Sequence, residues 1–278
     1  MSKNNNIPEA HDEMPDWPLP LRRVGVKNVR TKIRICNHEC RDYEVEIEAF
    51  INLPRNKRGA HISRFIKVIN EAITRPYSSF FDLVRTVANK LFQEHEYSDY
   101  VEVYLKTNVY KGPYNPASVK LGLKAEENNV KEFIKIKIEG LTVCPCVQKV
   151  YSFFENTPLD KTPTHMQRTR LCVTLLSRSI NIDLDEFIEL CLSGFSSQLE
   201  GYLNRYKEYL LIKRSLNNPR FVEDVVRKVA FSIFNRYKNT MDPDTYIKVS
   251  ALSYESIHPF NVYAEFKACL RDLENVLL

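Results

Sequence analysis

Two kinds of hydrophobic periodicity alternate along the first half of the chain. Residues 43–51 place apolar side chains at every second position with glutamates between them, a period of two that predicts a half-buried antiparallel strand. Residues 62–73 instead repeat at helical spacing until Pro76 ends the run, and a second helical pattern begins near Ser79. The strand pattern also covers 27–36, 101–105 and 118–125. The first half is therefore expected to fold as ββααββ.

The second half repeats this order of patterns without visible sequence identity. Alternation is strong at 133–138, a helical pattern starts near Asp183, and another covers 218–237. The remaining strand candidates are 168–177, 244–253 and 261–270. We therefore expect an α+β protein of two tandem ββααββ modules, each an antiparallel sheet covered on one face by a helix pair.

The modules are expected at 22–127 and 128–278, after a disordered polar segment at 1–21. A chain of 278 residues is longer than one typical core requires, which agrees with two modules. Long strands at the edges of such sheets are most simply covered by pairing with the other module or with another subunit. This predicts an oligomer.

The composition is that of an ordinary globular protein, with 44% hydrophobic and 27% charged residues. The net charge of +5 favours phosphate-bearing ligands, but the dense basic blocks of a duplex-DNA binder are missing, so no nucleic-acid partner is expected. The sequence has no run of 18 apolar residues and its first residues are polar. We therefore expect a soluble cytoplasmic protein that does not bind a membrane.

Seven cysteines in a chain of this length predict free thiols rather than a disulfide scaffold. Cys36, His38 and Cys40 resemble a metal cluster by spacing, but we interpret them as the polar loop of the first hairpin. Neither GxGxxG nor GxxxxGK[ST] is present, so a nucleotide would have to bind without the standard glycine-rich loops.

Reactive side chains gather in the second half. Cys144, followed closely by Cys146, comes where a strong strand ends, and His165 lies in the loop beyond it. Glu255 and His258 lie between the last two strands. Cysteine, histidine and carboxylate together suit Zn²⁺ or Fe²⁺ with a position left for water, as in a hydrolytic centre. The alternative for Cys144 is a small buried hydrophobic residue without a metal role.

Two helix starts carry candidate binding residues. Glu223, in the segment NPRFVED, can either satisfy free helix amides or accept two N–H groups from a guanidine-like ring edge. The segment NKRGAHISRF is basic around its helix start, which suits either phosphate binding or a solvated surface. Its basic residues are Lys57, Arg58, His61 and Arg64.

Six segments together resemble a known enzyme family. In chain order they are VGVKNVRTKI, NKRGAHISRF, LTVCPCVQ, PTHMQR, NPRFVED and ESIHP. They resemble the type IB GTP cyclohydrolases, most closely the archaeal branch of the methanopterin pathway. The resemblance implies two tandem tunnelling folds and a homotetramer with active sites between subunits.

The resemblance also implies roles for individual residues. Cys144 and His165 match metal ligands, and Glu255 and His258 match a pair close to the metal that serves in catalysis and as further ligands. Glu208 lies fifteen residues before Glu223, the separation in the family between a ligand glutamate and the glutamate that anchors the guanine. The basic residues of NKRGAHISRF would hold the triphosphate.

The implied reaction is hydrolytic opening of the guanine imidazole ring of GTP, with release of formate and formation of a 7,8-dihydroneopterin triphosphate or 2′,3′-cyclic phosphate. One divalent metal per subunit is implied, Fe²⁺ before Zn²⁺ or Mn²⁺. Two alternatives remain open. One is a tunnelling-fold nitrile reductase that acts on a deazaguanine with NADPH, and the other is a purine-binding protein without catalytic activity.

Overall fold

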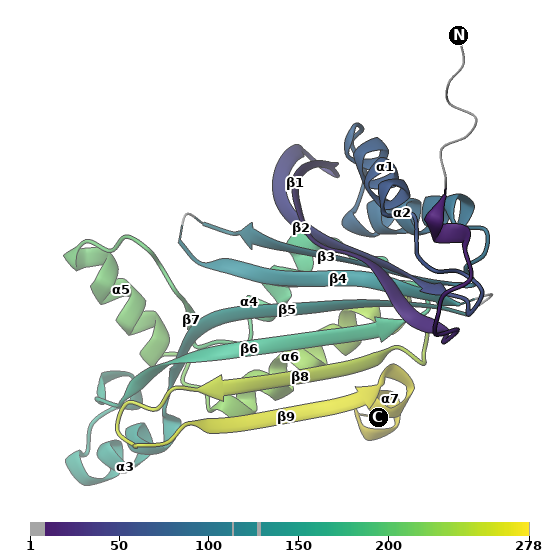
Figure 1. Cartoon of the computed structure of the whole chain (residues 1–278). Coiled ribbons are helices and arrows are strands. Elements are labelled where there is room, and N and C mark those ends of the chain that lie inside the picture. The colour runs from purple at the N-terminus through teal and green to yellow at the C-terminus, as the bar shows by residue number, and fades with distance from the viewer. Residues whose placement is uncertain (1–8, 113, 127–128, 278) are drawn as a thin grey trace. The chain divides into compact units, whose positions relative to one another are not determined.

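The computed structural model describes residues 9–112, 114–126 and 129–277 and divides into two units. The first unit contains the chain up to Thr107 and Leu121–Glu132, and the second contains Asn108–Lys120 and the chain from Phe133 onward. Three strands, labelled in Figure 1, contain residues of both units. They are β3 (Tyr100–Tyr110), β4 (Pro116–Glu126) and β5 (Asn129–Val143). The modules expected at 22–127 and 128–278 stay a prediction.

An antiparallel sheet and two helices form the first unit. Its own strands are β1 (Leu21–Cys36) and β2 (Cys40–Leu53), followed in strand order by β3 and β4, and its helices are α1 (Ile62–Ile73) and α2 (Phe80–Glu94). The alternation in β2 buries Val45, Ile47 and Ile51 as expected. Helix α1 packs against α2 and against β1. The hydroxyl of Ser79 caps α2 by accepting a hydrogen bond from the Asp82 amide.

The pairing of β1 with β2 contains two register shifts, between Leu21 and Val24 and between Val26 and Val29. Asn28 adopts the left-handed region, with φ 57°, inside the second irregularity. Gly25 lies between the two shifts, where a β-carbon would come 2.0 Å from the carbonyl oxygen of Ala49. A side chain at position 25 is therefore excluded by the close approach of β2.

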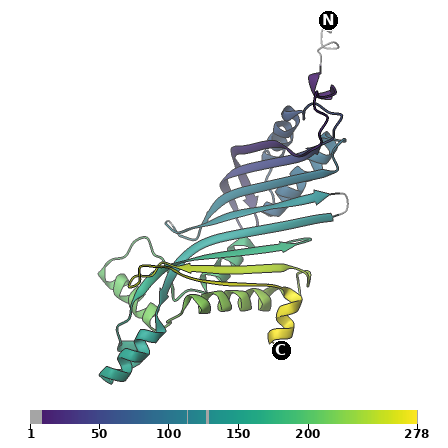
Figure 2. The ribbon, with the colours of Figure 1, turned by 60° about the horizontal axis from the view of Figure 1, so that its bottom comes forward.

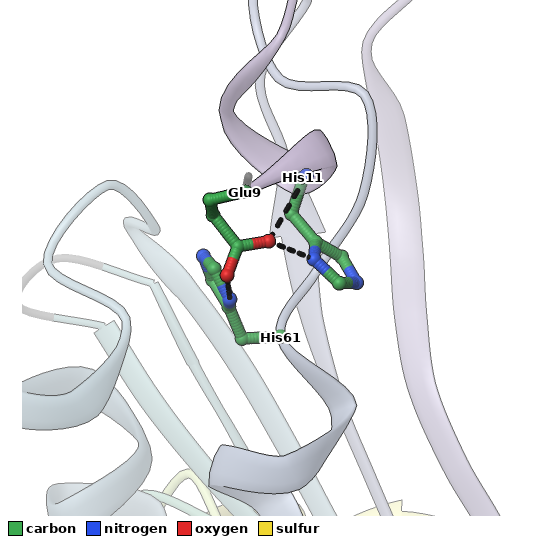
Figure 3. Close-up of side chains that lie close together, drawn as sticks. All are labelled: Glu9, His11 and His61. Atoms are coloured by element: carbon green, nitrogen blue, oxygen red, sulfur yellow. Dashed lines mark hydrogen bonds and ion pairs between the residues drawn. The ribbon is translucent and has the colours of Figure 1, made fainter. Parts of the chain in front are cut away.

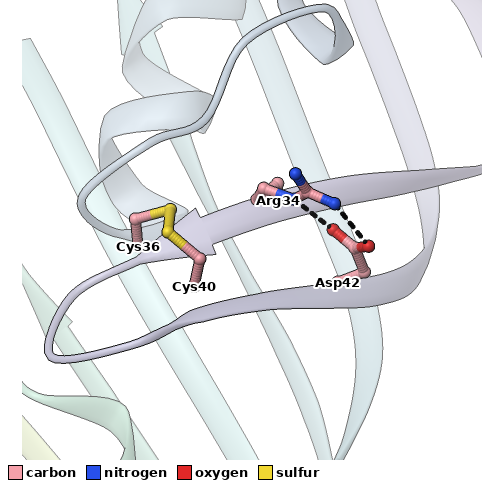
Figure 4. The surroundings of a disulfide bond; sticks show 4 residues. All are labelled: Arg34, Cys36, Cys40 and Asp42. Carbon is pink, nitrogen blue, oxygen red and sulfur yellow. Dashed lines mark hydrogen bonds and ion pairs between the residues drawn. A yellow bond between two sulfur atoms is a disulfide. The ribbon is translucent and has the colours of Figure 1, made fainter.

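A disulfide joins Cys36 and Cys40 at the ends of β1 and β2 (Figure 4). The hairpin was expected here, but the expectation of free thiols is wrong for this pair. Antiparallel pairing places Cys36 directly opposite Cys40, with their α-carbons 4.0 Å apart, so the sulfur atoms can meet. Next to the disulfide, Arg34 donates two hydrogen bonds to Asp42, at 2.7 and 2.9 Å.

Part of the polar segment expected to be disordered is folded. Residues 1–8 lie outside the described part of the chain, but Ala10–Asp12 form a short 3-10 helix, η1. The amides of Arg58 and Gly59 donate to the carbonyl of His11 at 3.1 and 3.2 Å. Contacts with the loop before α1 thus order residues that have no hydrophobic pattern of their own.

The second unit is also an antiparallel sheet with helices. Its strand order is β5, β6 (Met166–Ser177), β8 (Tyr246–Ser253) and β9 (Val262–Cys269), and the short β7 (Ser197–Gln198) pairs with β5. The expected helix pair is α4 (Leu184–Leu192) and α6 (Val222–Tyr237). Helix α6 packs along β8 and β9 (Figure 2), and it buries Val225, Val229 and Ile233.

Three helices of the second unit were not expected from the sequence. They are α3 (Pro145–Glu155), α5 (Arg205–Leu216) and α7 (Leu270–Leu277), and a short 3-10 helix, η2 (Leu159–Lys161), follows α3. The stretch between Cys144 and His165, described from the sequence only as a loop, is thus partly helical, with Pro145 at the first helical position. None of the described helices is both long enough and apolar enough to span a membrane.

Candidate active site

Cys144 and His165 lie side by side although they are distant in sequence. Cys144 occupies the junction between the end of β5 and the start of α3, and it is 9% exposed. Its amide donates to the carbonyl of His165 at 3.2 Å. The hydroxyl of Thr164 donates to the carbonyl of Cys144 at 2.7 Å. The loop between the two residues therefore brings His165 back to Cys144, through one hydrogen bond between backbone groups and one from a side-chain hydroxyl to the backbone.

The ring of His165 has a partner that sets its orientation. Nδ1 of His165 lies 3.0 Å from Oε1 of Gln167, and the side chain is half-buried. An amide oxygen accepts from a protonated Nδ1, which leaves Nε2 with a free lone pair. Histidines that bind metals are held in this way by an acceptor on the other ring nitrogen. The donor set and this partner both fit a metal ligand.

The helix start that carries Glu223 is attached to the same end of β5. The amide of Arg220 donates to the carbonyl of Val143 at 2.9 Å, and the two residues form an isolated antiparallel bridge. The Arg220 guanidinium donates to the carbonyls of Ser193 and Gly194 at 2.9 and 2.8 Å, and burial lowers the pKa of this guanidinium. Glu223 is exposed in the first turn of α6, a few residues after this anchor.

The connection between β8 and β9 reaches the start of β6, directly after His165. The amide of Tyr254 donates to the carbonyl of Arg168 at 2.9 Å. The hydroxyl of Ser253 donates to Oε1 of Glu255 at 2.7 Å, which fixes the carboxylate at the end of β8. His258 is exposed further along the connection and stacks on Phe260, with ring centroids 5.1 Å apart.

The structure does not gather all five expected metal ligands. Glu208 is exposed in the first turn of α5. Within the described residues, no three of the five bring ligand atoms within 4.8 Å of one another. The ligand and catalytic roles of these residues stay predictions: Cys144, His165, Glu208, Glu255 and His258. One other group does meet this distance, and it consists of Glu9, His11 and His61.

The expected phosphate-binding residues lie in the first unit and all have partners. Lys57 Nζ is 2.5 Å from Asp12 Oδ1, and Arg58 Nη1 is 2.7 Å from Glu13 Oε2. His61 faces the carboxylates of Glu9 at 3.7 Å and Asp12 at 3.8 Å. The Arg64 guanidinium donates to the carbonyl of Glu94 at 2.6 Å. The first three basic residues thus face carboxylates of the N-terminal segment.

A cavity of about 610 Å³ in the second unit is lined by residues that the sequence analysis did not single out. Arg168, Arg170 and Glu139 line it, and the same three residues line a neighbouring hollow beside Tyr254. Arg170 donates to Glu139 at 3.1 and 2.9 Å. The alternation in the segment RTR after His165 could have indicated that both arginines share one face of β6.

Comparison with known proteins identifies the family. Residues 7–264 match the family model described as Type I GTP cyclohydrolase folE2. The chain belongs to this family. Proteins named GTP cyclohydrolase MptA resemble it over nearly their whole length. The protein from Methanococcoides burtonii is 29% identical, with 97% of this chain and 96% of the relative covered. The one from Picrophilus torridus is 29% identical, with 95% of each chain covered.

Solved structures of uricases share the fold of this GTP cyclohydrolase family member. Uricase from Arthrobacter globiformis superposes with a TM-score of 0.53 at 10% identity, over 90% of this chain and 94% of the uricase. A uricase from Bacillus fastidious gives a TM-score of 0.55 at 8% identity, over 91% and 95% of the two chains. At such low identity the likeness concerns the fold alone. It confirms the expected α+β tunnelling fold.

Proposed function

We propose that this chain is a type IB GTP cyclohydrolase, which opens the imidazole ring of the guanine of GTP and releases formate. Family membership supports this proposal, and so do the names of the relatives. The observation that carries it is the direct backbone contact between Cys144 and His165 beside the anchored helix start of Glu223. The two proposed metal ligands and the helix start that carries the proposed guanine-binding carboxylate thus lie near the same end of β5.

The donor set suits a divalent metal. Cys144 and His165 would hold it, with Glu208, Glu255 and His258 as further ligands, and Fe²⁺ is favoured over Zn²⁺ or Mn²⁺. A metal bound there supplies a Lewis acid that polarises water for hydrolysis. Gln167 keeps the His165 ring in the orientation that leaves Nε2 free.

The chain's own residues bind and orient the base. The carboxylate of Glu223 accepts hydrogen bonds from the guanine N1–H and the 2-amino group, because its two oxygens match paired donors. His258 is the general acid and base that moves protons at the opening ring, and Glu255, held by Ser253, orients it. Lys57, Arg58, His61 and Arg64 hold the triphosphate.

The product is a 7,8-dihydroneopterin phosphate for pterin biosynthesis. Its form is either the triphosphate or the 2′,3′-cyclic phosphate, and the resemblance to the archaeal methanopterin branch favours the cyclic form. We further propose a cytoplasmic homotetramer whose active sites lie between subunits. Mass analysis of the product formed from GTP under anaerobic conditions with Fe²⁺ separates the two phosphate forms.

Substitution of Cys144 tests the proposed metal centre. Cys144→Ala should lower formate release from GTP by at least about 10²-fold, since loss of a ligand costs more than loss of a residue that only supports a ligand. The matched control is Cys146→Ala, which removes the neighbouring exposed thiol and should keep most of the activity. Full formate release by Cys144→Ala would exclude the proposed metal role.

Substitution of Glu223 tests the proposed guanine anchor. Glu223→Gln should raise the KM for GTP and reduce the preference for GTP over inosine triphosphate, which lacks the 2-amino group. One lost charge-assisted pair is worth about 1.5–3 kcal/mol, which corresponds to roughly 10- to 150-fold in kcat/KM. If kcat falls while KM and the preference for GTP are unchanged, Glu223 has a chemical role instead.

A further inference from the structure

Three side chains from two separate segments converge in the first unit (Figure 3). Glu9 and His11 belong to the N-terminal segment, and His61 immediately precedes α1. The segments are joined through their backbones, because the amides of Arg58 and Gly59 both donate to the carbonyl of His11. The cluster is therefore part of a hydrogen-bonded contact rather than a chance approach of surface side chains.

The carboxylate of Glu9 lies between the two imidazole rings. One of its oxygens contacts Nδ1 of His11, and the other lies 3.7 Å from Nδ1 of His61. The rings are 4.7 Å apart at their centroids, and each of the three residues offers a ligand atom within 4.8 Å of the others. Ligands around tetrahedral zinc, with bonds of about 2.0–2.2 Å, are separated by about 3.3–3.6 Å. Small side-chain rotations thus suffice to surround an ion.

The three residues of the cluster differ in burial, with one ligand packed inside the fold and two accessible to solvent. The side chain of His61 is only 11% exposed, whereas His11 and Glu9 are open to solvent. The His11 ring lies against Gly59, where a β-carbon would come 2.9 Å from its Cδ2 atom. A buried ligand with accessible partners can accept an ion from solution without opening the fold.

The charges around the cluster favour a cation. Glu9 and Asp12 both face His61, the latter at 3.8 Å from Nε2. Lys57 and Arg58 are positive groups on this side, and they are already paired with Asp12 and Glu13. Two imidazoles and a carboxylate form a ligand set for Zn²⁺ and similar transition metals, whereas Ca²⁺ and Mg²⁺ prefer shells of oxygen atoms.

We propose that Glu9, His11 and His61 bind a divalent transition-metal ion, with water at the remaining position, and that this ion fastens the N-terminal segment to the start of α1. The site shares no residue with the centre proposed at Cys144, and it contains no thiolate. Its His61 is also among the residues proposed to hold the triphosphate, and in the ion-bound form His61 contacts the ion instead. The site does not depend on the proposed cyclohydrolase activity, because it concerns binding of an ion by residues of the first unit alone.

Cobalt binding to the chelator-treated full-length protein tests this site. Equilibrium dialysis against Co²⁺ under anaerobic conditions, followed by metal analysis, gives the number of tightly bound ions per chain. His11→Ala and Glu9→Gln should each bind one ion fewer than the parent protein. The near-ultraviolet absorption from a thiolate bound to cobalt belongs to the Cys144 centre, so it should stay unchanged in both variants.

Two matched variants serve as controls. Glu13→Gln removes a carboxylate from the same segment but outside the cluster, and His38→Ala removes a histidine from the hairpin loop. Both should bind as many Co²⁺ ions as the parent. In addition, Co²⁺ should raise the Tm of His11→Ala less than that of the parent, because one stabilising ion is lost.

The proposal is overturned if His11→Ala binds as many Co²⁺ ions as the parent, or if the control variants lose as many as His11→Ala does. Failure of the proposed function has a different signature. In that case formate is not released from GTP, or the thiolate absorption is missing from the parent. The difference of one ion between the parent and His11→Ala would persist.

Discussion

Glu102 is a buried carboxylate of β3, only 1% exposed, that keeps its charge through several partners. Tyr100 and Tyr104 donate their hydroxyls to it, the latter at 2.7 Å, while Arg23 and Lys124 lie 2.9 and 3.4 Å away. Burial acts to raise the pKa of Glu102. The hydrogen bonds and the two positive charges together outweigh burial and leave this pKa below its usual value of 4.5.

This lowered pKa predicts a pH dependence of stability. The stabilisation is fully present above about pH 4.5, where the unfolded carboxyl is ionised, and is lost as the pH falls through the lower pKa of the folded state. At neutral pH, Glu102→Gln should reduce the free energy of unfolding by about 1–3 kcal/mol. The difference from the parent should shrink on acidification towards about pH 3.

Urea unfolding of both proteins at several pH values measures this difference. Glu46→Gln is a useful comparison, because Glu46 is a more exposed carboxylate of β2 that pairs with Lys106. Its effect at neutral pH should be about 1 kcal/mol or less. A difference between the parent and Glu102→Gln that does not change with pH would show that Glu102 does not titrate as described.

At the scale of elements, the irregular pairing of β1 with β2 depends on one backbone conformation. Asn28 lies in the left-handed region, which glycine and asparagine tolerate better than branched residues do. Asn28→Val should therefore destabilise the protein by about 1–2 kcal/mol, measured as a lower midpoint of urea unfolding. Asn28→Gly is the control and should change stability little. Equal destabilisation by both would mean that the asparagine side chain is what matters.

The ion pairs of the N-terminal segment also lead to a prediction about the KM for GTP. Asp12 and Glu13 pair with Lys57 and Arg58, two of the residues proposed to hold the triphosphate. A bound triphosphate would have to replace these carboxylates. Exposed ion pairs are each worth about 0.2–1 kcal/mol, so loss of both pairs in the double variant Asp12→Asn, Glu13→Gln should lower the KM for GTP by about two- to thirtyfold with little change in kcat. An unchanged KM would show that the carboxylates of Asp12 and Glu13 do not compete with the triphosphate of GTP.

At the scale of the whole molecule, exposed aromatic side chains support the expected oligomer. Phe153 and Phe154 at the end of α3 are 81% and 76% exposed in the single chain. Contiguous exposed apolar side chains are typical of surfaces that contact another subunit. Phe153→Ser with Phe154→Ser should lower the molar mass measured by light scattering. The control Leu19→Ser changes another exposed apolar position and should leave the molar mass unchanged. A full-sized oligomer in the double variant would show that α3 is not part of the subunit interface.

The sequence predicted the antiparallel sheets and their helix pairs because these elements bury a regular stripe of apolar residues. Helices α3 and α5 were not predicted. Apolar side chains such as Phe153 and Tyr209 are exposed in them, so these helices do not bury a regular stripe of apolar residues. The disulfide escaped because its formation depends on the register that sets Cys36 opposite Cys40. Neither the two helices nor the disulfide can be recognised from the spacing of residues in the sequence alone.

The candidate site was predictable where strand ends determine it. Cys144 and His165 flank β5 and β6, and their contact follows from the pairing of these strands. The contact of His11 with His61 was not predictable, because it depends on backbone hydrogen bonds to the loop before α1. The position of Glu208 on α5 depends on a helix that the sequence pattern did not reveal.

Strands β3, β4 and β5 each contain residues of both units, and this has a consequence for biosynthesis. The first unit needs residues up to Glu132, but by then the ribosome has already made Asn108–Lys120, which belong to the second unit. The residues of the two units thus alternate along the chain, and part of the second unit is synthesised before the first unit is complete. Expressing the gene as two pieces divided near residue 127 would leave each product without strand segments that complete its fold.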